Sequence, residues 1–382
     1  MHKNVFNNLL IILMFCHSNP IIAGATKSGE PQHFYVGTYT NSGSKGIYSF
    51  SLNPMNGKLS DLGLAAESTN PSFLALTPDG MYLLAVNEIA DGKNSNMGYI
   101  QSFATNSNDH MLRPVSKVVS GGADPCFISV NQAGNVLTAN YSGGNVALFH
   151  LNKTGELSPP CDIQQHFGEG PIKQRQSQPH VHSSYFEPNS NRIFVADLGT
   201  DKVALYNLPE GGTKLEKSEI QSINLIPGSG PRHLVFHPSL KFVYIVNEIS
   251  NSISVVNLNK DGSFTTIETI STLPDKTSTT NNCADIHISK DGRFLYASNR
   301  GINTIAIFSV DPQKGNIRLI GQEPTRGEIP RNFTLSPNED FLLVANQNSQ
   351  NIVSFRRNQE TGKLEYADQI KALKPVCLLF CK

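Results

Sequence analysis

The chain has 382 residues, of which 31 are basic and 31 acidic, so its formal net charge is zero. A balanced charge lacks the basic excess of nucleic-acid-binding proteins, and we expect no nucleic-acid partner. Hydrophobic residues make up 38 % of the chain, which also has 30 glycines and 22 prolines. This composition is typical of a globular protein rich in strands and turns.

The first 25 residues are predicted to form a signal peptide. Lys3 precedes a short apolar stretch at residues 9–15 (LLIILMF), and small residues follow at 23–25 (AGA). The apolar stretch is too short to span a bilayer. We therefore expect cleavage after Ala25 and an exported protein, periplasmic or secreted, that does not stay at the membrane. The alternative is an uncleaved anchor.

A repeat of about fifty residues organises the rest of the chain. Similar segments, such as PSFLALTPDGMYLLAVNE and PRNFTLSPNEDFLLVANQ, start at residues 71, 125, 181, 231, 283 and 330. A seventh, incomplete segment (PVCLLF) starts at residue 375. A period of this length indicates repeated supersecondary units.

Each unit is predicted to contain four short strands. In the unit that starts at 231, we place them at residues 234–236, 242–246, 252–257 and 265–270, which we call strands A to D. No helical periodicity lies between them. Four short strands per repeat are typical of a β-propeller blade, whereas a β-helix needs shorter repeats and a sandwich does not repeat.

The two ends of the chain are predicted to share a blade. The segment at 375 supplies only strand A, and residues 34–40, 46–52 and 59–65 supply strands B, C and D. Pairing these ends closes the ring and removes exposed sheet edges. We therefore predict that residues 26–382 form a single all-β domain. Its fold is a seven-bladed β-propeller with four antiparallel strands per blade.

The start of strand A and the end of strand B should surround one mouth of the central channel, because the two strands are antiparallel. One slot near the end of B is nearly uniform, and we expect it to be mainly structural: Asn87, Asn140, Asp197, Asn247, Asn299 and Asn346. The next slot varies: Glu88, Tyr141, Leu198, Glu248, Arg300 and Gln347. The start of A also varies: Ser72, Cys126, His182, Arg232, Ala284, Arg331 and Val376.

The charged members of these slots cluster in four consecutive blades. They are His182, Arg232, Glu248, Arg300 and Arg331. Three arginines at a partly enclosed mouth need counter-charge, and Glu248 offsets only one. Guanidinium groups grip carboxylates and phosphates, so an anionic or oxygen-rich ligand is expected there. The alternative is a structural ring of ion pairs that closes the channel.

We expect different roles for the individual histidines near the mouth. His180 and His182 form an H-x-H pair, but no nearby third ligand completes a metal site, and we expect no metal. A neutral histidine beside Arg and Glu suits proton transfer or ligand hydrogen bonding. His233 should face away from Arg232 and pack between blades. The loop at 164–178 either covers the mouth or is merely solvated.

Several motifs together resemble one family. FYVGTYT, PHVHS, GPRHLVFHP, VNE, SNRG and PRNFTLSP are similar, in this order, to segments of the seven-bladed propeller lactonases. That family includes bacterial 6-phosphogluconolactonases and a fungal carboxymuconate lactonizing enzyme. The resemblance implies hydrolysis of a sugar-acid lactone, or lactonization of a muconate. It also implies that His182, Arg232, Glu248 and Arg300 form the site.

From these residues we expect a lactonase that uses no cofactor and acts as a monomer on a small anionic or sugar-derived lactone. Glu248 or His182 would be the general base, and Arg232 would stabilise the oxyanion. The predicted substrate-binding residues are His180, Arg300, Arg331, Asn299, Asn346 and Gln347. Export favours an unphosphorylated lactone. The alternatives are a non-catalytic propeller that binds an anionic ligand, a glycan or a protein, and a muconate-type lactonizing isomerase.

Overall fold

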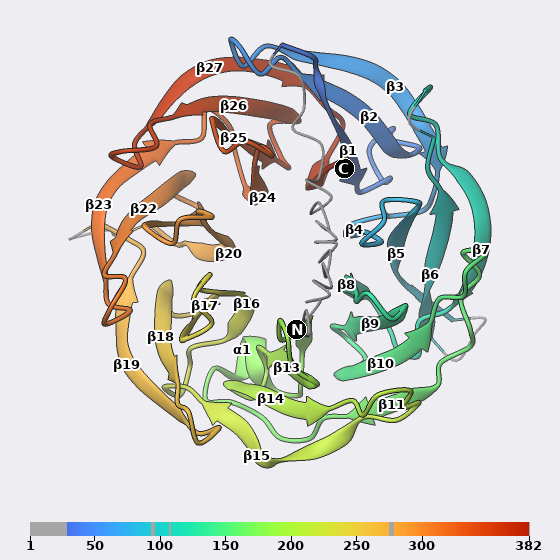
Figure 1. Cartoon of the computed structure of the whole chain (residues 1–382), viewed down its shortest axis with the longest axis vertical. Helices are drawn as coiled ribbons and strands as arrows, with labels where there is room; N and C mark the ends of the chain where they lie inside the picture. Colours follow the sequence, from blue (N-terminus) through green and yellow to red (C-terminus); the bar gives the residue numbers. More distant parts are fainter. Residues whose placement is uncertain (1–28, 93–95, 107, 275–278, 382) are drawn as a thin grey trace, which may run out of the picture.

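Short runs of β-branched and aromatic residues alternate with turn residues, and these runs form strands of 3 to 10 residues. The computed structural model describes residues 29–92, 96–106, 108–274 and 279–381. They form seven four-stranded antiparallel sheets arranged in a ring (Figure 1). The predicted seven-bladed β-propeller is therefore confirmed. The predicted signal peptide lies outside the described residues.

Each sheet is one blade, and its strands A to D run from the channel outward (Figure 1). The composite blade contains β28 (Pro375–Phe380), β1 (Gln32–Thr38), β2 (Gly46–Leu52) and β3 (Leu59–Glu67). Blade 1 contains β4 (Leu74–Leu76), β5 (Tyr82–Asp91), β6 (Met97–Ala104) and β7 (Arg113–Val119). Blade 2 contains β8 (Pro125–Val130), β9 (Asn135–Asn140), β10 (Asn145–His150) and β11 (Asp162–Gln165).

Blade 3 contains β12 (Val181–Phe186), β13 (Arg192–Asp197), β14 (Lys202–Asn207) and β15 (Glu216–Asn224). Blade 4 contains β16 (Pro231–Phe236), β17 (Phe242–Asn247), β18 (Ser252–Leu258) and β19 (Phe264–Ser271). Blade 5 contains β20 (Asn282–Ile288), β21 (Phe294–Arg300), β22 (Thr304–Val310) and β23 (Ile317–Pro324). Blade 6 contains β24 (Pro330–Leu335), β25 (Phe341–Asn346), β26 (Asn351–Arg357) and β27 (Leu364–Lys371).

The strands predicted for the unit at 231 agree with blade 4, since each observed strand contains the predicted one and extends beyond it. The one helix among the described residues is α1 (Lys173–Gln176), in the loop between β11 and β12. Within the same ranges, no helix is long and apolar enough to cross a bilayer.

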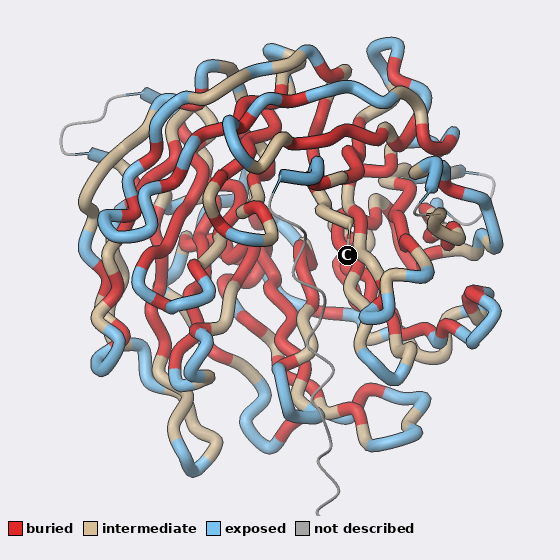
Figure 2. The backbone as a smooth tube through the Cα atoms, turned by 45° about the horizontal axis from the view of Figure 1, so that its top comes forward, coloured by how far each residue is buried: buried red, intermediate tan, exposed pale blue. Residues whose placement is uncertain are grey.

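The core lies between the blades. Apolar side chains form seven clusters among the described residues, one for each pair of adjacent blades. The cluster between blades 4 and 5, for example, includes Tyr244, Val246, Leu295 and Phe308. Burying one such aliphatic or aromatic side chain contributes roughly 1.5–3 kcal/mol. Figure 2 shows buried segments concentrated in the inner strands and exposed ones in the loops.

The two ends of the chain close the ring as predicted. β1 pairs antiparallel with β28, so that Phe34 lies opposite Phe380 and Val36 opposite Leu378. Blade 6 supports this pairing, because the side-chain Oδ1 of Asn332 accepts the backbone N–H of Leu378 at 2.7 Å. The composite blade is therefore held on both sides by its neighbours.

A β-bulge or similar irregularity lies near the start of strand A in six blades. The register between strands A and B shifts at 125/127, 181/183, 231/233, 283/286, 330/332 and 375/377. The residues that these shifts leave without a partner on strand B are Cys126, His182, Arg232, Ala284, Asp285, Arg331 and Val376. A bulge re-aims the side chain of its extra residue. The variable slot at the start of strand A is therefore a bulge position in these blades.

Removing β28 should destabilise the protein strongly. A chain that ends at Lys374 exposes the edge of β1 and the apolar faces that β28 covers, so we expect insoluble protein or a clearly lower urea midpoint. A chain that ends at Phe380 is the control and should keep the midpoint of the full chain. Equal midpoints for the two truncated chains would contradict ring closure by β28.

Candidate functional site

A buried carboxylate, Glu248, lies where three guanidinium groups meet. It follows β17, is 5 % exposed, and donates its backbone N–H to the carbonyl of Gly230 at 2.7 Å. Its Oε2 lies 3.0 Å from Nε of Arg232 and 2.8 Å from Nη2 of Arg300. Its Oε1 pairs with Nη2 of Arg175. The structure thus brings together three residues predicted from sequence and adds Arg175.

Backbone carbonyls of blade 5 orient two of these arginines. Arg232 occupies the bulge of β16 and donates from Nη1 to the carbonyl of Ala284 at 2.6 Å. Arg300, the last residue of β21, donates from Nη2 to the carbonyl of Cys283 at 2.8 Å. Each planar guanidinium is thereby fixed between a carbonyl and the shared carboxylate.

The charges at this cluster do not balance. Burial opposes ionisation of Glu248, but Arg300, Arg232 and Arg175 outweigh that effect and hold its pKa well below the ordinary 4.5. Burial lowers the pKa of Arg232 to about 10, and repulsion from Arg300 and Arg331 adds to this. Glu248 and Arg232 therefore stay charged at neutral pH. Three cations share one anion, which suits an anionic or electron-rich ligand.

The third arginine, Arg175, comes from the loop between β11 and β12. The fully buried side chain of Gln176 anchors α1 by donating to the carbonyl of Leu198 at 2.9 Å and to Oδ1 of Asp201 at 2.7 Å. Arg175 also donates from Nη1 to Oδ1 of Asn282 at 3.3 Å and is 34 % exposed. This loop therefore reaches over the cluster rather than lying free in solvent.

His182 and His180 surround one tyrosine. His182, in the bulge of β12, is 4 % exposed, and its ring lies edge-on to Tyr141 at 5.6 Å and to His233 at 5.3 Å. The Sγ of Cys126 lies 3.8 Å from its Nδ1. His180 instead stacks on Tyr141 at 4.3 Å. The described residues contain no group of three His, Cys, Asp or Glu placed to hold a metal.

The expected separation of His233 from Arg232 is wrong. Nε2 of His233 lies 3.3 Å from Nη1 of Arg232, because the bulge at Arg232 turns consecutive side chains toward the channel. Nδ1 of His233 lies 2.8 Å from Oδ1 of Asp285 in the next blade. The other oxygen of Asp285 accepts Asn332 Nδ2 at 2.5 Å and lies 3.1 Å from Nε2 of His287. His233 thus joins a buried polar chain across three blades.

A second acidic group lies in blade 1. Glu88, near the end of β5, accepts the phenolic hydroxyl of Tyr39 at Oε1, at 2.8 Å. Nη2 of Arg331 is 3.9 Å from the same oxygen, and its guanidinium lies 5.3 Å from the centre of the Tyr39 ring. Arg331 thus pairs with a different carboxylate from the one that Arg232 and Arg300 share.

Glu88 and Arg232 line the same narrow cavity. Its lining consists of Ser72, Phe73, Glu88, Cys126, Arg232, His233, Arg331, Asn332 and Val376. Five of these occupy the slot at the start of strand A, namely Ser72, Cys126, Arg232, Arg331 and Val376. The starts of strand A from five blades therefore meet at one place, as the antiparallel geometry predicts.

Asparagine side chains in the uniform slot near the end of strand B donate hydrogen bonds to backbone carbonyls. Asn299 donates from Nδ2 to the carbonyl of Thr272 at 3.1 Å, and Asn346 donates to the carbonyl of Thr325 at 3.0 Å. Both side chains are fully buried. Gln347 is half-buried. Substrate binding by Asn299, Asn346 and Gln347 stays a prediction.

Sequence reasoning does not identify three residues of this region. Arg175 lies in the 164–178 loop. The sequence suggests that this loop either covers the channel mouth or is solvated, and it assigns none of the loop residues to the site. Glu88 occupies the same slot as Glu248 and carries the same VNE signature, yet it lies outside the four blades of the predicted charged cluster. Tyr39 lies in the FYVGTYT motif. The VNE repeat is the signal that could have identified Glu88.

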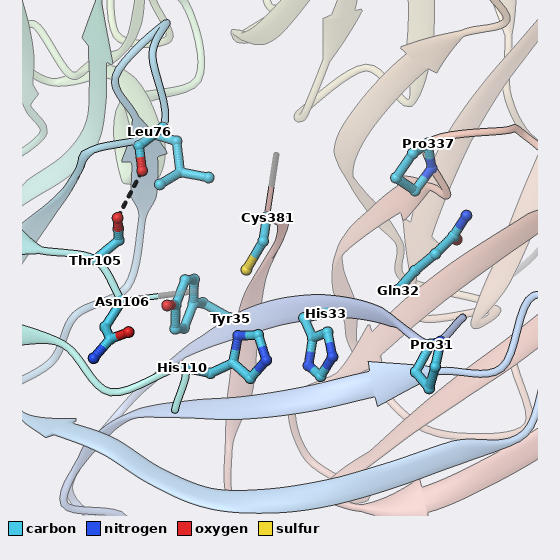
Figure 3. A pocket seen from close by; sticks show the side chains of 11 residues that line it. Pro31, Gln32, His33, Tyr35, Leu76, Thr105, Asn106, His110, Pro337 and Cys381 are labelled. Carbon is cyan, nitrogen blue, oxygen red and sulfur yellow. Dashed lines mark hydrogen bonds between the residues drawn. The ribbon is translucent and has the colours of Figure 1, made fainter. Parts of the chain in front are cut away.

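A different pocket lies at the other end of the inner hairpins (Figure 3). It is bordered by Leu76, where β4 ends, and by Gln32, where β1 begins. His33 and His110 stack in it with ring centres 3.6 Å apart, and Cys381 lies nearby. None of its lining residues carries a carboxylate or a guanidinium. This pocket therefore lacks the charges of the Glu248 cluster.

The sequence and the fold can be compared with those of known proteins. Residues 33–380 match the family described as "Lactonase, 7-bladed beta-propeller". The chain is 36 % identical over 349 residues to a protein of Bacillus subtilis named 6-phosphogluconolactonase, an alignment that covers 91 % of this chain and 97 % of the relative. It is 37 % identical over 340 residues to a protein of that name from Formosa agariphila, covering 88 % and 95 %.

Two solved structures are also similar. A putative 6-phosphogluconolactonase from Bacteroides fragilis superimposes with a TM-score of 0.86 at 36 % identity, covering 94 % of this chain and all of that one. A periplasmic gluconolactonase from Pseudomonas aeruginosa superimposes with a TM-score of 0.87 at 31 % identity, covering 92 % and 99 %. The sequence match and the shared ring together show that this chain belongs to the seven-bladed β-propeller lactonase family.

Proposed function

We propose that this protein hydrolyses a sugar-acid lactone at the channel mouth where Arg232, Arg300 and Arg175 converge on Glu248. That convergence is the observation that carries the proposal, because it concentrates fixed hydrogen-bond donors at one buried place. Family membership and relatives named 6-phosphogluconolactonase and gluconolactonase support it.

The arginines suit the charge that lactone hydrolysis creates. Water adds to the carbonyl carbon, negative charge develops on the carbonyl oxygen, and the ring carbon–oxygen bond then breaks. Preorganised donors at such an oxygen typically contribute roughly 10²–10³-fold in rate. Arg232 is the most deeply buried guanidinium of the cluster, and we assign it this role. Arg300 and Arg331 would bind the other oxygens of the substrate.

Glu248 serves in this proposal to hold the arginines together. Without it, three like charges would share a buried site, each uncompensated. His182 lies beside this cluster as a neutral imidazole, because burial and the charges of Arg232 and Arg331 hold its pKa well below 6.5. It is therefore able to accept hydrogen bonds from the hydroxyl groups of a sugar lactone.

The predicted signal peptide bears on the choice of lactone. An exported enzyme would rarely meet a phosphorylated sugar lactone, so we propose an unphosphorylated substrate outside the cytoplasm. The similar protein from Pseudomonas aeruginosa is named a periplasmic gluconolactonase, which supports this choice.

Lactone hydrolysis by the purified chain tests the proposal directly. Glucono-1,5-lactone and its 6-phosphate should both be assayed against the spontaneous reaction, with the higher kcat/KM for the unphosphorylated form. Hydrolysis of neither substrate, nor of a wider panel of lactones, would leave a binding protein as the better interpretation. Conversion of a muconate without any lactone hydrolysis would favour an isomerase.

Replacing Glu248 should abolish most activity and lower stability. In Glu248→Gln the three guanidiniums lose their carboxylate, so we expect kcat/KM to fall at least about 100-fold and the free energy of unfolding to fall by about 3–5 kcal/mol. Lactone assays and urea unfolding measure the two effects.

Glu187→Gln is the matched control for this variant. Glu187 is likewise buried and pairs with one arginine, Arg192, which is 26 % exposed, through bonds of 2.7 and 2.6 Å, but it lies in the turn between β12 and β13. We expect this variant to lose stability and keep its kcat/KM. Equal activity of the two variants would remove Glu248 from the site.

The buried histidines make stability depend on pH. Burial lowers the pKa of His233 to about 4, and the charge of Arg232 acts in the same direction. The pKa of His182 is also held below 6.5. Between pH 6.5 and about 4, the unfolded chain binds protons at these positions that the folded chain does not. The free energy of unfolding must therefore fall as the pH decreases through this window.

Urea unfolding at pH 7 and pH 5 should show this loss, at most about 1.4 kcal/mol per pH unit for each histidine. His233→Gln removes one titrating group and keeps a donor for Asp285, so its stability should fall less between the two pH values. Both pH values lie above the ordinary pKa values of the carboxyl groups of Glu248 and Asp285, which are 4.5 and 3.8. A variant whose stability falls as steeply as that of the wild type would refute the assignment to His233.

A further inference from the structure

We propose that Glu88, rather than Glu248, is the carboxylate that takes the proton from the attacking water, an inference that rests on the proposed lactonase function. Glu88 lines the same cavity as Arg232 and Arg331. The two carboxylates differ in what their oxygens already bind, and this difference decides between them.

Glu248 is poorly suited to act as a base. One of its oxygens pairs with Arg175 and the other with both Arg232 and Arg300. A carboxylate that accepts several charged donors loses basicity, since protonation would leave those cations uncompensated in a buried place. Any proton bound by Glu248 would also break the contacts that hold the arginines.

One carboxylate oxygen of Glu88 makes no hydrogen bond to the part of the chain that the structure describes. Its Oε1 accepts the Tyr39 hydroxyl at 2.8 Å, whereas its Oε2 is buried and has no hydrogen-bond partner among the described residues. Burial raises the pKa of Tyr39, so the phenol stays protonated and keeps donating. Arg331 is 3.9 Å from Oε1, which is too long for a hydrogen bond. A buried carboxylate oxygen without a donor is costly unless water or substrate fills the position.

The backbone holds this carboxylate in place. The N–H of Glu88 donates to the carbonyl of Asn70 at 3.0 Å, and the carbonyl of Glu88 accepts the side-chain amide of Asn70 at 3.1 Å. The hydroxyl of Ser72, which lines the same cavity, is likewise buried without a hydrogen-bond partner among the described residues. Two residues whose buried oxygens have no hydrogen-bond partner in the described part of the chain therefore line a cavity that Arg232 also lines.

The chemical step balances without a further reactant. The water oxygen bonds to the lactone carbonyl carbon while one of its protons passes to Oε2 of Glu88. The tetrahedral intermediate then collapses, the ring carbon–oxygen bond breaks, and the same proton passes to the departing alkoxide oxygen. Lactone and water give the open hydroxy acid, and Glu88 returns to its ionised state.

The alternative role for Glu88 is that of a structural partner for Arg331 and Tyr39. Glu88→Gln is the first test, because the amide keeps the size of the side chain and can still accept from Tyr39, but it can neither take a proton nor balance the charge of Arg331. If Glu88 is the base, kcat for glucono-1,5-lactone should fall on the order of 10²–10⁴-fold with a much smaller change in KM. A kcat within threefold of the wild-type value would overturn the proposal.

Rescue by formate gives a readout that a structural role would not move. Glu88→Ala leaves room for a small carboxylate, so added formate should raise its kcat in proportion to concentration, while Glu248→Ala should not respond. Restoration of Glu248→Ala alone would assign the base to Glu248 instead. Near-UV circular dichroism checks that both variants fold. Failure of the wild-type enzyme to hydrolyse any lactone would refute the proposed function, whereas these variants test only the assignment of the base.

Discussion

The antiparallel pairing of β1 with β28 is the interaction on which the rest of the molecule depends. It joins the two ends of the chain into one blade and so places blade 1 beside the composite blade and the composite blade beside blade 6. Only this closure brings together Tyr39, Glu88 and Arg331, which come from three successive blades around the ring. A strand at the extreme C-terminus thereby determines the geometry of polar groups at the channel mouth.

Two carboxylates in equivalent slots of distant blades have different surroundings. Glu248 binds three guanidiniums and compensates charges that would otherwise repel each other in a buried place. Glu88 accepts one phenol and lies beside one guanidinium, and its second oxygen has no hydrogen-bond partner within the described ranges. The same sequence signature, VNE, therefore occurs in two electrostatic environments. Residues from neighbouring blades determine which environment each glutamate has.

The repeat and its turns are sufficient to predict the blades, because a period near fifty residues and four short strands allow few other folds. The convergence of Arg232, Glu248 and Arg300 also follows from antiparallel geometry. The position of Arg175 could not be predicted, since it depends on how the buried side chain of Gln176 anchors a long loop. The orientation of His233 could not be predicted either, because a bulge is a backbone irregularity that alternation of side chains does not reveal.

The bulge residues at the start of strand A carry the variable side chains of the rim, and they take no part in the cross-strand pairing that holds each blade together. A bulge residue has no partner in the ladder, so its side chain can change without loss of a cross-strand pair. Cys126, His182, Arg232 and Arg331 occupy such positions on closely similar hairpins. The ring is in this respect an evolvable scaffold, in which side chains at the rim can be exchanged while the apolar clusters between blades stay intact.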